Sequence, residues 1–273
     1  MRTRLHLALL FPLACLLGCT VSTTPATQTT SSPSIAGNWQ IQSGTAITSP
    51  PTAPYLVGAL QGTNSALTGT FTAQINTVSP TVESYSGTFN PSTGSLVLNS
   101  TLPLPANQTT ATLSVPANPT NLASGTVVDQ CGVCDNGLST PVVAVQIAPL
   151  NGTYTGTLTE SIASPAISKT VTLVISQSTT PNSSGQFPLS GTFTWDNADN
   201  VLSSFPFVGT IGGEGIYIEP TVIAVTPGPA FIVTGYANPT ATQITVPYLA
   251  FYPYPTVANP PVVPVYTGTL TLQ

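Results

Sequence analysis

Charged side chains are scarce in this chain. Asp, Glu, Lys and Arg make up 4% of its 273 residues, against about 25% in a typical soluble domain. Both arginines and the only histidine lie within the first six residues, so Lys169 is the one cation beyond that point. Binding to nucleic acid requires Lys and Arg to displace counterions from phosphates, and clamping of a phosphate group relies on Arg. The composition therefore excludes nucleic acid as a partner.

The absence of histidine beyond His6 also limits catalysis. A Ser-His-Asp triad cannot be built. A Ser-Lys pair would depend on Ser168 and Lys169, which lie in an alternating stretch that predicts an outward-facing cation. A glycosidase needs two carboxylates that face one bond, but Glu214 and Glu219 differ by an odd number and would point to opposite faces of a strand. The remaining candidates for such a pair are Glu83 and Glu160. We predict that the protein is not an enzyme.

The first segment of the chain has the pattern of an export signal. Arg2 and Arg4 precede an apolar run over 5–17, which is shorter than the roughly 20 residues that span a bilayer and typical of a secretory signal. Leu16-Leu17-Gly18-Cys19 follows and resembles the lipobox of bacterial lipoproteins. The resemblance implies that residues 1–18 form a signal peptide, which is cleaved before Cys19.

By the same resemblance, Cys19 carries acyl chains that hold the protein on a membrane, because two or three chains bind firmly where one does not. Thr20 follows the cysteine, and the absence of Asp there favours the outer membrane if the organism has one. The expected location is the cell envelope. The mature chain would keep one cation and eight acids, a formal charge of −7, so an anionic lipid surface is not its electrostatic partner.

Residues 19–34 are rich in Thr, Ser and Pro and cannot form a core. We interpret them as a tether. From Ile35 onward the apolar residues alternate with Thr at a period of two, as in Leu67 to Ala73 and Lys169 to Ile175. This period indicates strands with one buried face, and frequent Pro and Gly indicate short connections. The predicted fold is all-β and antiparallel.

Short sequence motifs recur at nearly fixed offsets along the chain. They indicate two related halves, 35–135 and 149–273. Gly69 and Gly87 match Gly191 and Gly209 at an offset of 122 residues, each before Thr. Residues 96–98 match 216–218 at 120, and residues 37–39 match 152–154 at 115. We expect five or six strands in each half. The candidate ranges are 36–43, 55–62, 66–75, 84–90, 95–101, 110–115 and 123–128, then 152–160, 169–177, 188–195, 205–211, 215–226, 230–237, 243–252 and 262–272.

The body opens with Gly37-Asn38-Trp39, which resembles the Gly-x-Trp word at the start of lipocalin barrels. The resemblance covers three residues and implies a barrel-like curl in which Trp39 closes one end. The arginine that supports this tryptophan in lipocalins has no counterpart, because the mature chain contains no Arg. Barrel-like and sandwich halves both remain open.

Cys131-Gly132-Val133-Cys134 is the only thiol pair in the mature chain besides Cys19. We predict a disulfide between Cys131 and Cys134, as suits an oxidising compartment. A redox motif would begin a helix, and the neighbouring Asp129 and Asp135 would raise rather than lower a thiol pKa. A zinc site needs two more ligands. The turn over 196–200 holds two aspartates that could bind Ca²⁺, but such turns are usually solvated. We predict neither a metal nor a cofactor.

The remaining candidates for a binding role are tyrosines that could stack on sugars. Those expected to be exposed are Tyr248, Tyr252, Tyr254 and Tyr266, although the simpler interpretation places them in the core. The sequence thus predicts a lipid-anchored envelope protein with a non-catalytic binding or structural role. The alternative is a β module that binds a carbohydrate or a small apolar ligand. A glycan or an envelope protein is the expected partner.

Overall fold

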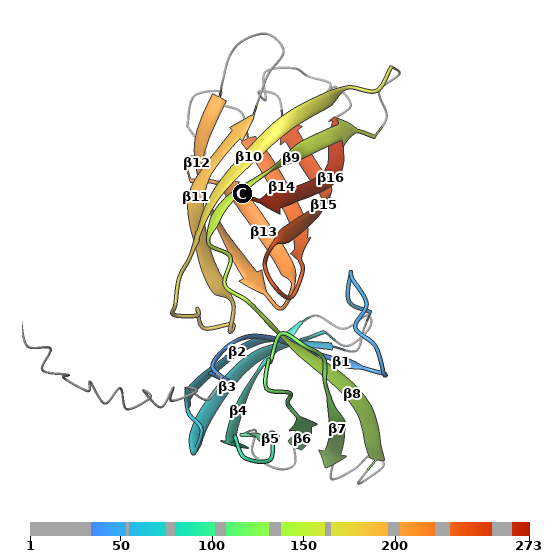
Figure 1. Ribbon diagram of the computed structural model, residues 1–273, viewed down its shortest axis with the longest axis vertical. Helices are drawn as coiled ribbons and strands as arrows, with labels where there is room; N and C mark the ends of the chain where they lie inside the picture. Colours follow the sequence, from blue (N-terminus) through green and yellow to red (C-terminus); the bar gives the residue numbers. More distant parts are fainter. Residues whose placement is uncertain are drawn as a thin grey trace, which may run out of the picture. The chain divides into compact units, whose positions relative to one another are not determined.

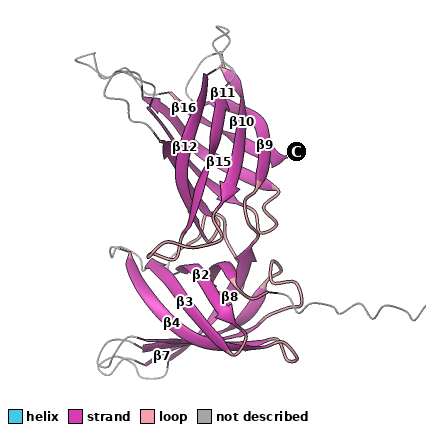
Figure 2. Cartoon of the chain, turned by 90° about the vertical axis from the view of Figure 1, so that its left-hand side faces the viewer, coloured by secondary structure: helices cyan, strands magenta, loops and turns pink. Residues whose placement is uncertain are grey.

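Every element that the structure describes is a β-strand. The computed structural model describes residues 34–52, 55–74, 80–101, 108–130, 138–161, 165–195, 203–221, 230–252 and 264–273, and within these ranges it contains no helix (Figure 2). The prediction of an all-β antiparallel fold is confirmed. The strands are β1 (Gly37–Ser43), β2 (Tyr55–Thr63), β3 (Ala66–Gln74), β4 (Thr81–Asn90), β5 (Ser95–Ser100), β6 (Gln108–Ser114), β7 (Ala123–Gln130), β8 (Leu138–Ile147), β9 (Gly152–Glu160), β10 (Ser168–Gln177), β11 (Phe187–Trp195), β12 (Ser203–Gly212), β13 (Gly215–Pro220), β14 (Ala230–Ala237), β15 (Gln243–Tyr252) and β16 (Val265–Leu272).

The strands form two closed barrels in which each strand pairs with its neighbours in sequence (Figure 1). The first barrel contains β1 to β8 and closes where Trp39 of β1 lies opposite Gln146 of β8. The second contains β9 to β16 and closes where Glu160 of β9 lies opposite Tyr266 of β16. Closure leaves neither barrel with an unpaired edge strand. Of the two architectures left open by the sequence, the barrel is the one observed.

The words repeated in sequence fall on equivalent strands of the two barrels. Gly69 and Gly191 lie on β3 and β11, which are the third strand of each barrel. Gly87 and Gly209 lie on the fourth strands, and the matched triplets 96–98 and 216–218 lie on the fifth. The two halves therefore share strand order as well as short words, as the repeat predicted.

Each barrel has eight strands, against an expected five or six and candidate ranges that number seven and eight, and the first barrel continues past the expected boundary at residue 135. The strand that closes this barrel is β8, which begins at Leu138. Its sequence does not alternate, because Val142 and Ala144 face the core of the first barrel while Val145 and Ile147 pack into the core cluster of the second. A strand covered on both faces has a continuous apolar run instead of a period of two.

Side chains fill the interiors of both barrels. In the first, Trp39, Phe71 and Leu96 are fully buried, and the Trp39 indole donates a hydrogen bond to the carbonyl oxygen of Ile35 at 2.9 Å. In the second, the rings of Phe193 and Phe231 stack with centroids 4.5 Å apart. Such packing leaves little room for a ligand along the axis of either barrel.

The predicted signal peptide, Cys19 and nearly all of the tether lie outside the described residues, which begin at Ser34. Residues 32–273 form one compact unit that contains both barrels. In the part of the chain that the structure describes, no helix has the length and apolar character needed to cross a membrane.

Candidate functional site

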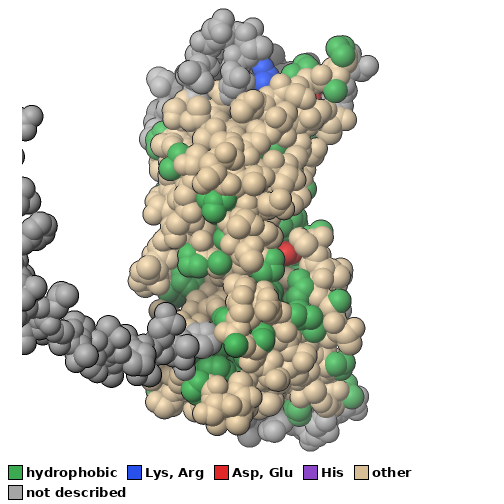
Figure 3. Space-filling model, in the orientation of Figure 1, with side chains coloured by type: hydrophobic (Ala, Val, Ile, Leu, Met, Phe, Trp, Pro, Cys, Tyr) green, Lys and Arg blue, Asp and Glu red, His purple; other side chains and the backbone are tan. Residues whose placement is uncertain are grey.

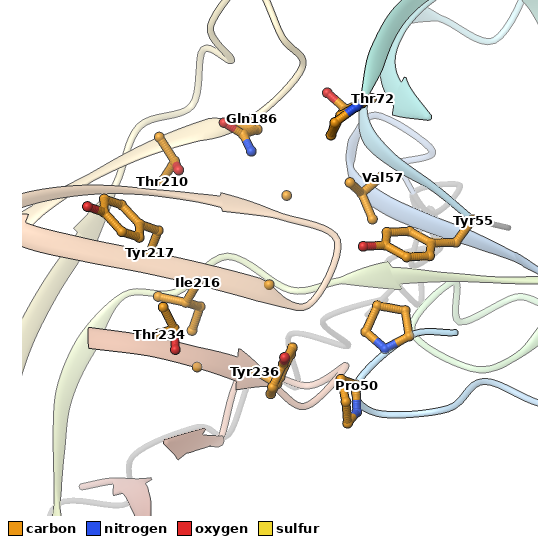
Figure 4. Close-up of a pocket in the computed structure, with 15 residues that line it drawn as sticks. Pro50, Tyr55, Val57, Thr72, Gln186, Thr210, Ile216, Tyr217, Thr234 and Tyr236 are labelled. Carbon is orange, nitrogen blue, oxygen red and sulfur yellow. The ribbon is translucent and has the colours of Figure 1, made fainter. Parts of the chain in front are cut away.

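A groove with a volume of about 380 Å³ lies where the two barrels meet. Its walls carry three tyrosines, Tyr55 of β2, Tyr217 of β13 and Tyr236 of β14, and we call it the tyrosine groove (Figure 4). The described residues that line it include no charged side chain; they are Pro50, Pro51, Tyr55, Val57, Thr72, Pro80, Gln186, Thr210, Gly212, Gly215, Ile216, Tyr217, Thr234, Gly235 and Tyr236. The groove is thus lined by aromatic rings, proline and aliphatic side chains, glycines, hydroxyl groups and an amide.

Strand alternation places the tyrosine rings in the groove. On β13, Ile216 and Ile218 point into the second barrel, so Tyr217 points outward and is 40% exposed. Its hydroxyl donates to a carboxylate oxygen of Glu219 at 2.9 Å. In Figure 4 the Tyr55 hydroxyl is directed from the first barrel toward the strands of the second.

Tyr55 remains a neutral phenol over the physiological pH range. Its partial burial raises the pKa of the hydroxyl, and the nearby Tyr236 and Glu214 raise it further. The hydroxyl therefore keeps its proton and can both donate and accept a hydrogen bond. A tyrosine in this state offers an apolar face together with a polar end.

The turn between β12 and β13 forms one end of the groove and packs against β1. Asn38 donates a hydrogen bond to the Gly213 carbonyl oxygen and accepts one from the Gly213 N–H, each at 2.7 Å. The Glu214 N–H donates to Gln40 Oε1 at 3.1 Å. We call these four residues, Asn38, Gln40, Gly213 and Glu214, the interbarrel contact. It explains why the outward-facing Asn38 and Gln40 are buried although they are polar.

Gly213 is required at this turn for two reasons. Its φ of +58° belongs to the left-handed region, which glycine adopts without strain. A Cβ atom there would also lie 2.5 Å from Val57 Cγ1 and 2.7 Å from Gln40 Oε1. The missing side chain therefore lets the turn approach β1 and β2 closely enough to form the interbarrel contact.

Glu214 carries a buried carboxyl group at the interbarrel contact. Only 4% of the residue is exposed, and its Oε1 atom has no hydrogen-bond partner in the described part of the chain. Burial raises the pKa of this carboxyl from 4.5 to about 7, although the side chains of Ser49 and Gln40 act in the opposite direction. The group consequently changes charge near neutral pH.

A second contact between the barrels uses the connection from β10 to β11. The Thr72 hydroxyl of β3 donates to the Ser184 carbonyl oxygen at 3.0 Å. Gly185 approaches the same strand so closely that a Cβ atom would lie 2.0 Å from the Thr70 carbonyl oxygen. The tyrosine groove is thus bounded by two short connections of the second barrel, both of which contact the first.

Two further cavities lie elsewhere among the described residues. One, of about 180 Å³, opens at the end of the first barrel, where Tyr85 donates to Glu83 at 2.7 Å and also bonds to Thr109. The other, of about 710 Å³, follows the connection between the barrels and is lined by several Asn and Gln side chains. Two of these amides bond to the chain itself, Gln177 to the Leu150 N–H and Gln146 to the Ala36 carbonyl oxygen.

The four glutamates weighed as catalytic candidates lie in four different places. Glu83 is at the open end of the first barrel. Glu160 is at the end of β9, beside Tyr266. Glu214 lies in a turn rather than within a strand, so the odd spacing to Glu219 does not apply to it. Glu219 is exposed on β13. The expectation that Lys169 faces outward is wrong, because it shares the face of Val171 and Leu173, which are buried.

The tyrosines chosen from the sequence differ from those that line the groove. Tyr266 is buried in the second barrel with its ring 4.8 Å from that of Trp195, which agrees with the simpler interpretation of a core residue and not with an exposed ring that stacks on sugars. Tyr248 is half-buried on β15. The side chain of Tyr252 and all of Tyr254 lie outside the described residues. Tyr217 could have been found, since it lies between two inward-facing isoleucines, whereas Tyr55 and Tyr236 meet only through the packing of the barrels.

Cys131, Cys134 and the aspartates of 196–200 lie outside the described residues, so the disulfide and the weaker calcium hypothesis stay predictions. Among the residues that the structure does describe, no three His, Cys, Asp or Glu side chains are grouped as they would be around a metal ion.

Comparison with known proteins gives a distant structural likeness. No family model and no curated protein matches the chain. Five chains of solved structure match, among them a protein of unknown function from the DUF3598 family of Nostoc punctiforme. That match covers 87% of this chain and 94% of the other, with 10% identity and a TM-score of 0.29.

Proposed function

We propose that this protein is a lipid-anchored protein of the cell envelope that binds a neutral carbohydrate, without catalysis, in the tyrosine groove. The observation that carries the proposal is a groove of about 380 Å³ lined by three tyrosines and three threonines, with no charged side chain among its described lining residues. Small-ligand sites have volumes of about 300–1,000 Å³ and combine apolar walls with a few polar groups.

The chemistry of the lining suits a sugar. A sugar ring has an apolar C–H face that packs on an aromatic ring and hydroxyl groups that both donate and accept hydrogen bonds. Tyr55, Tyr217 and Tyr236 supply the rings, while Thr72, Thr210, Thr234 and Gln186 supply polar groups around them. The filled barrel interiors argue against an apolar ligand held along a barrel axis.

We propose a neutral ligand because no positively charged side chain is found among the described lining residues to pair with an anion. Acidic residues outnumber basic ones by eight to three in the whole chain, and on the face drawn in Figure 3 side chains of either charge are few. A negative ligand would meet a repulsive net field. A cationic ligand would call for a carboxylate in the lining, and the described lining residues include none.

The test is binding of the purified, lipidated protein to arrayed glycans in a zwitterionic detergent, because sugar-headgroup detergents would compete. We expect binding to neutral glycans and none to their sulfated or uronic-acid counterparts. Replacing a tyrosine at the centre of a site typically costs about 1–2 kcal/mol, or roughly 5- to 30-fold in affinity. Tyr55→Ala and Tyr217→Ala should each show such a loss.

Val174→Ala is the matched control, since Val174 is an exposed side chain on β10 that does not line the groove. It should bind as the unmodified protein does. Equal binding of anionic glycans, or full affinity in both tyrosine variants, would disprove the proposal.

A further inference from the structure

The interbarrel contact places the buried carboxyl group of Glu214 in the turn that also forms one end of the tyrosine groove. The groove has walls from both barrels, Tyr55, Val57 and Thr72 from the first and Tyr217 and Tyr236 from the second. The β12–β13 turn that carries Glu214 contributes its two ends, Gly212 and Gly215, to the lining. A change at Glu214 therefore alters the surface that a ligand would contact.

No positive charge compensates the carboxylate form of Glu214. The side chains that face it from β1 and the following loop are Gln40 and Ser49, neither of which ionises. From β2 and β14 the titratable neighbours are the phenols of Tyr55 and Tyr236. Lys169, the one cation in the described residues, lies near the start of β10, at the other end of the second barrel from the β12–β13 turn.

The neutral form of the carboxyl fits this environment and the charged form does not. Burying an uncompensated charge costs far more than burying a neutral carboxyl group. Gln40 Nε2 and Glu214 Oε1 are both buried and both lack a hydrogen-bond partner within the described ranges. The contact is thus held by the backbone bonds of Gly213 and Glu214, and only the uncharged side chains of Gln40 and Ser49 favour the carboxylate form, against the larger effect of burial.

We propose that ionisation of Glu214 weakens the interbarrel contact as pH rises. The affinity of the tyrosine groove then also depends on pH. When the carboxyl group is protonated, the β12–β13 turn stays seated on Asn38 and Gln40 and the two walls of the groove are held together. Loss of the proton draws the carboxylate toward water, weakens the contact and separates the walls. The effect on affinity rests on the proposed carbohydrate binding, whereas the effect on the contact does not.

Hydrogen–deuterium exchange of the full chain tests the contact without a ligand. The amide protons of Gly213 and Glu214 donate to Asn38 and Gln40, so their protection, corrected for intrinsic exchange, reports the contact. We expect protection of the 212–215 turn to fall about tenfold from pH 5.5 to pH 8.5. Glu214→Gln keeps the shape and stays neutral, so its protection should not change with pH.

Two further variants make the result decisive. Asn38→Ala removes both bonds to Gly213 and should lower protection equally at both pH values, which verifies that the turn reports the contact. Glu219→Gln, at an exposed carboxylate on the same hairpin, should behave as the unmodified protein. Equal pH dependence in Glu214→Gln and the unmodified chain, or none in either, would overturn the proposal.

A glycan titration at the same two pH values separates this proposal from the proposed function. If a neutral glycan binds, we expect affinity to fall about tenfold at pH 8.5 in the unmodified protein but not in Glu214→Gln. If no glycan binds while the exchange results hold, the proposed function fails and the pH-dependent contact stands.

Discussion

At the scale of single residues, Glu214 links the stability of the protein to pH. It is one of eight acids in the chain, and it is buried where the described residues provide no cation. Its pKa of about 7 in the folded protein, against 4.5 for an ordinary Glu, means that the folded state holds this proton more tightly than the unfolded state. Folding and protonation of Glu214 therefore favour each other.

The pH dependence of stability follows from this raised pKa. Between pH 4.5 and about 7 the folded state binds more protons than the unfolded state, so stability falls as pH rises through that window and stays low above it. The shift corresponds to about 3 kcal/mol. We predict that Glu214→Gln matches the unmodified protein at pH 4 and exceeds it by up to about 3 kcal/mol at pH 8.

Urea unfolding of the two proteins at both pH values measures the difference. Glu219→Gln should change little at either pH, because Glu219 is exposed. If Glu214→Gln proved less stable than the unmodified protein at pH 8, the carboxylate would be stabilising and the account of this residue would fail.

The sequence identified Glu214 as a notable acid but assigned it the wrong surroundings. The comparison of Glu214 with Glu219 assumes one alternating strand, whereas Glu214 lies in the turn between β12 and β13. What buries the carboxyl is β1, more than 170 positions earlier in the chain. Periodicity reports which face of its own strand a residue occupies, and a contact between two barrels leaves no such pattern.

At the scale of elements, glycines allow neighbouring strands to come close together. A Cβ atom on Gly87 of β4 would lie 2.2 Å from the carbonyl oxygen of Val97 on β5. A Cβ atom on Gly209 of β12 would lie 2.2 Å from that of Tyr217 on β13. The two positions are equivalent in the two barrels. In each barrel, the glycine of the repeated Gly-Thr motif lies where the neighbouring strand comes too close for a side chain.

We predict that Gly87→Ala and Gly209→Ala destabilise the protein by similar amounts. The added methyl group would overlap a backbone oxygen that can move only with its strand, and overpacking of this kind costs about 1–3 kcal/mol. Gly215→Ala is the control, because its nearest neighbour would be at an ordinary 3.5 Å and its φ is not positive. Thermal unfolding of the three variants should separate the first two from the third. A Gly87 variant as stable as the Gly215 variant would contradict this explanation.

Most strands could be predicted because one of their faces is exposed. All eight predicted ranges of the second half overlap observed strands, and Lys169 to Ile175 lies within β10 as expected. The exception is β8, which is buried on both faces from Val142 to Val145 and contains Pro141. Proline and the loss of alternation both argue against a strand when the sequence is read alone, and only the closure of the barrel places one there.

At the scale of the whole molecule, the proposed envelope location rests on the N-terminal motif that resembles a lipobox. We predict that cells given an alkyne-bearing fatty acid label the protein at Cys19 and that Cys19→Ser abolishes both the label and membrane association. Acyl chains contribute roughly 0.8 kcal/mol per buried CH₂ group, so their loss should release the protein entirely.

Cys131→Ser is the control for this labelling. It removes a thiol from the body of the chain and should leave the lipid label unchanged. An unlabelled unmodified protein, or label that persists in Cys19→Ser, would remove the basis for the envelope assignment.

We propose that the tyrosine groove, rather than a barrel interior, holds a neutral sugar. The most direct test is photo-crosslinking with a diazirine-bearing neutral oligosaccharide selected on the array, followed by peptide mapping. We expect crosslinks in β2 near Tyr55 and in β13 near Tyr217, with loss of crosslinking when the unmodified oligosaccharide is added in excess. Competable crosslinks confined to core residues such as Phe71 or Phe193, or none that compete, would contradict it.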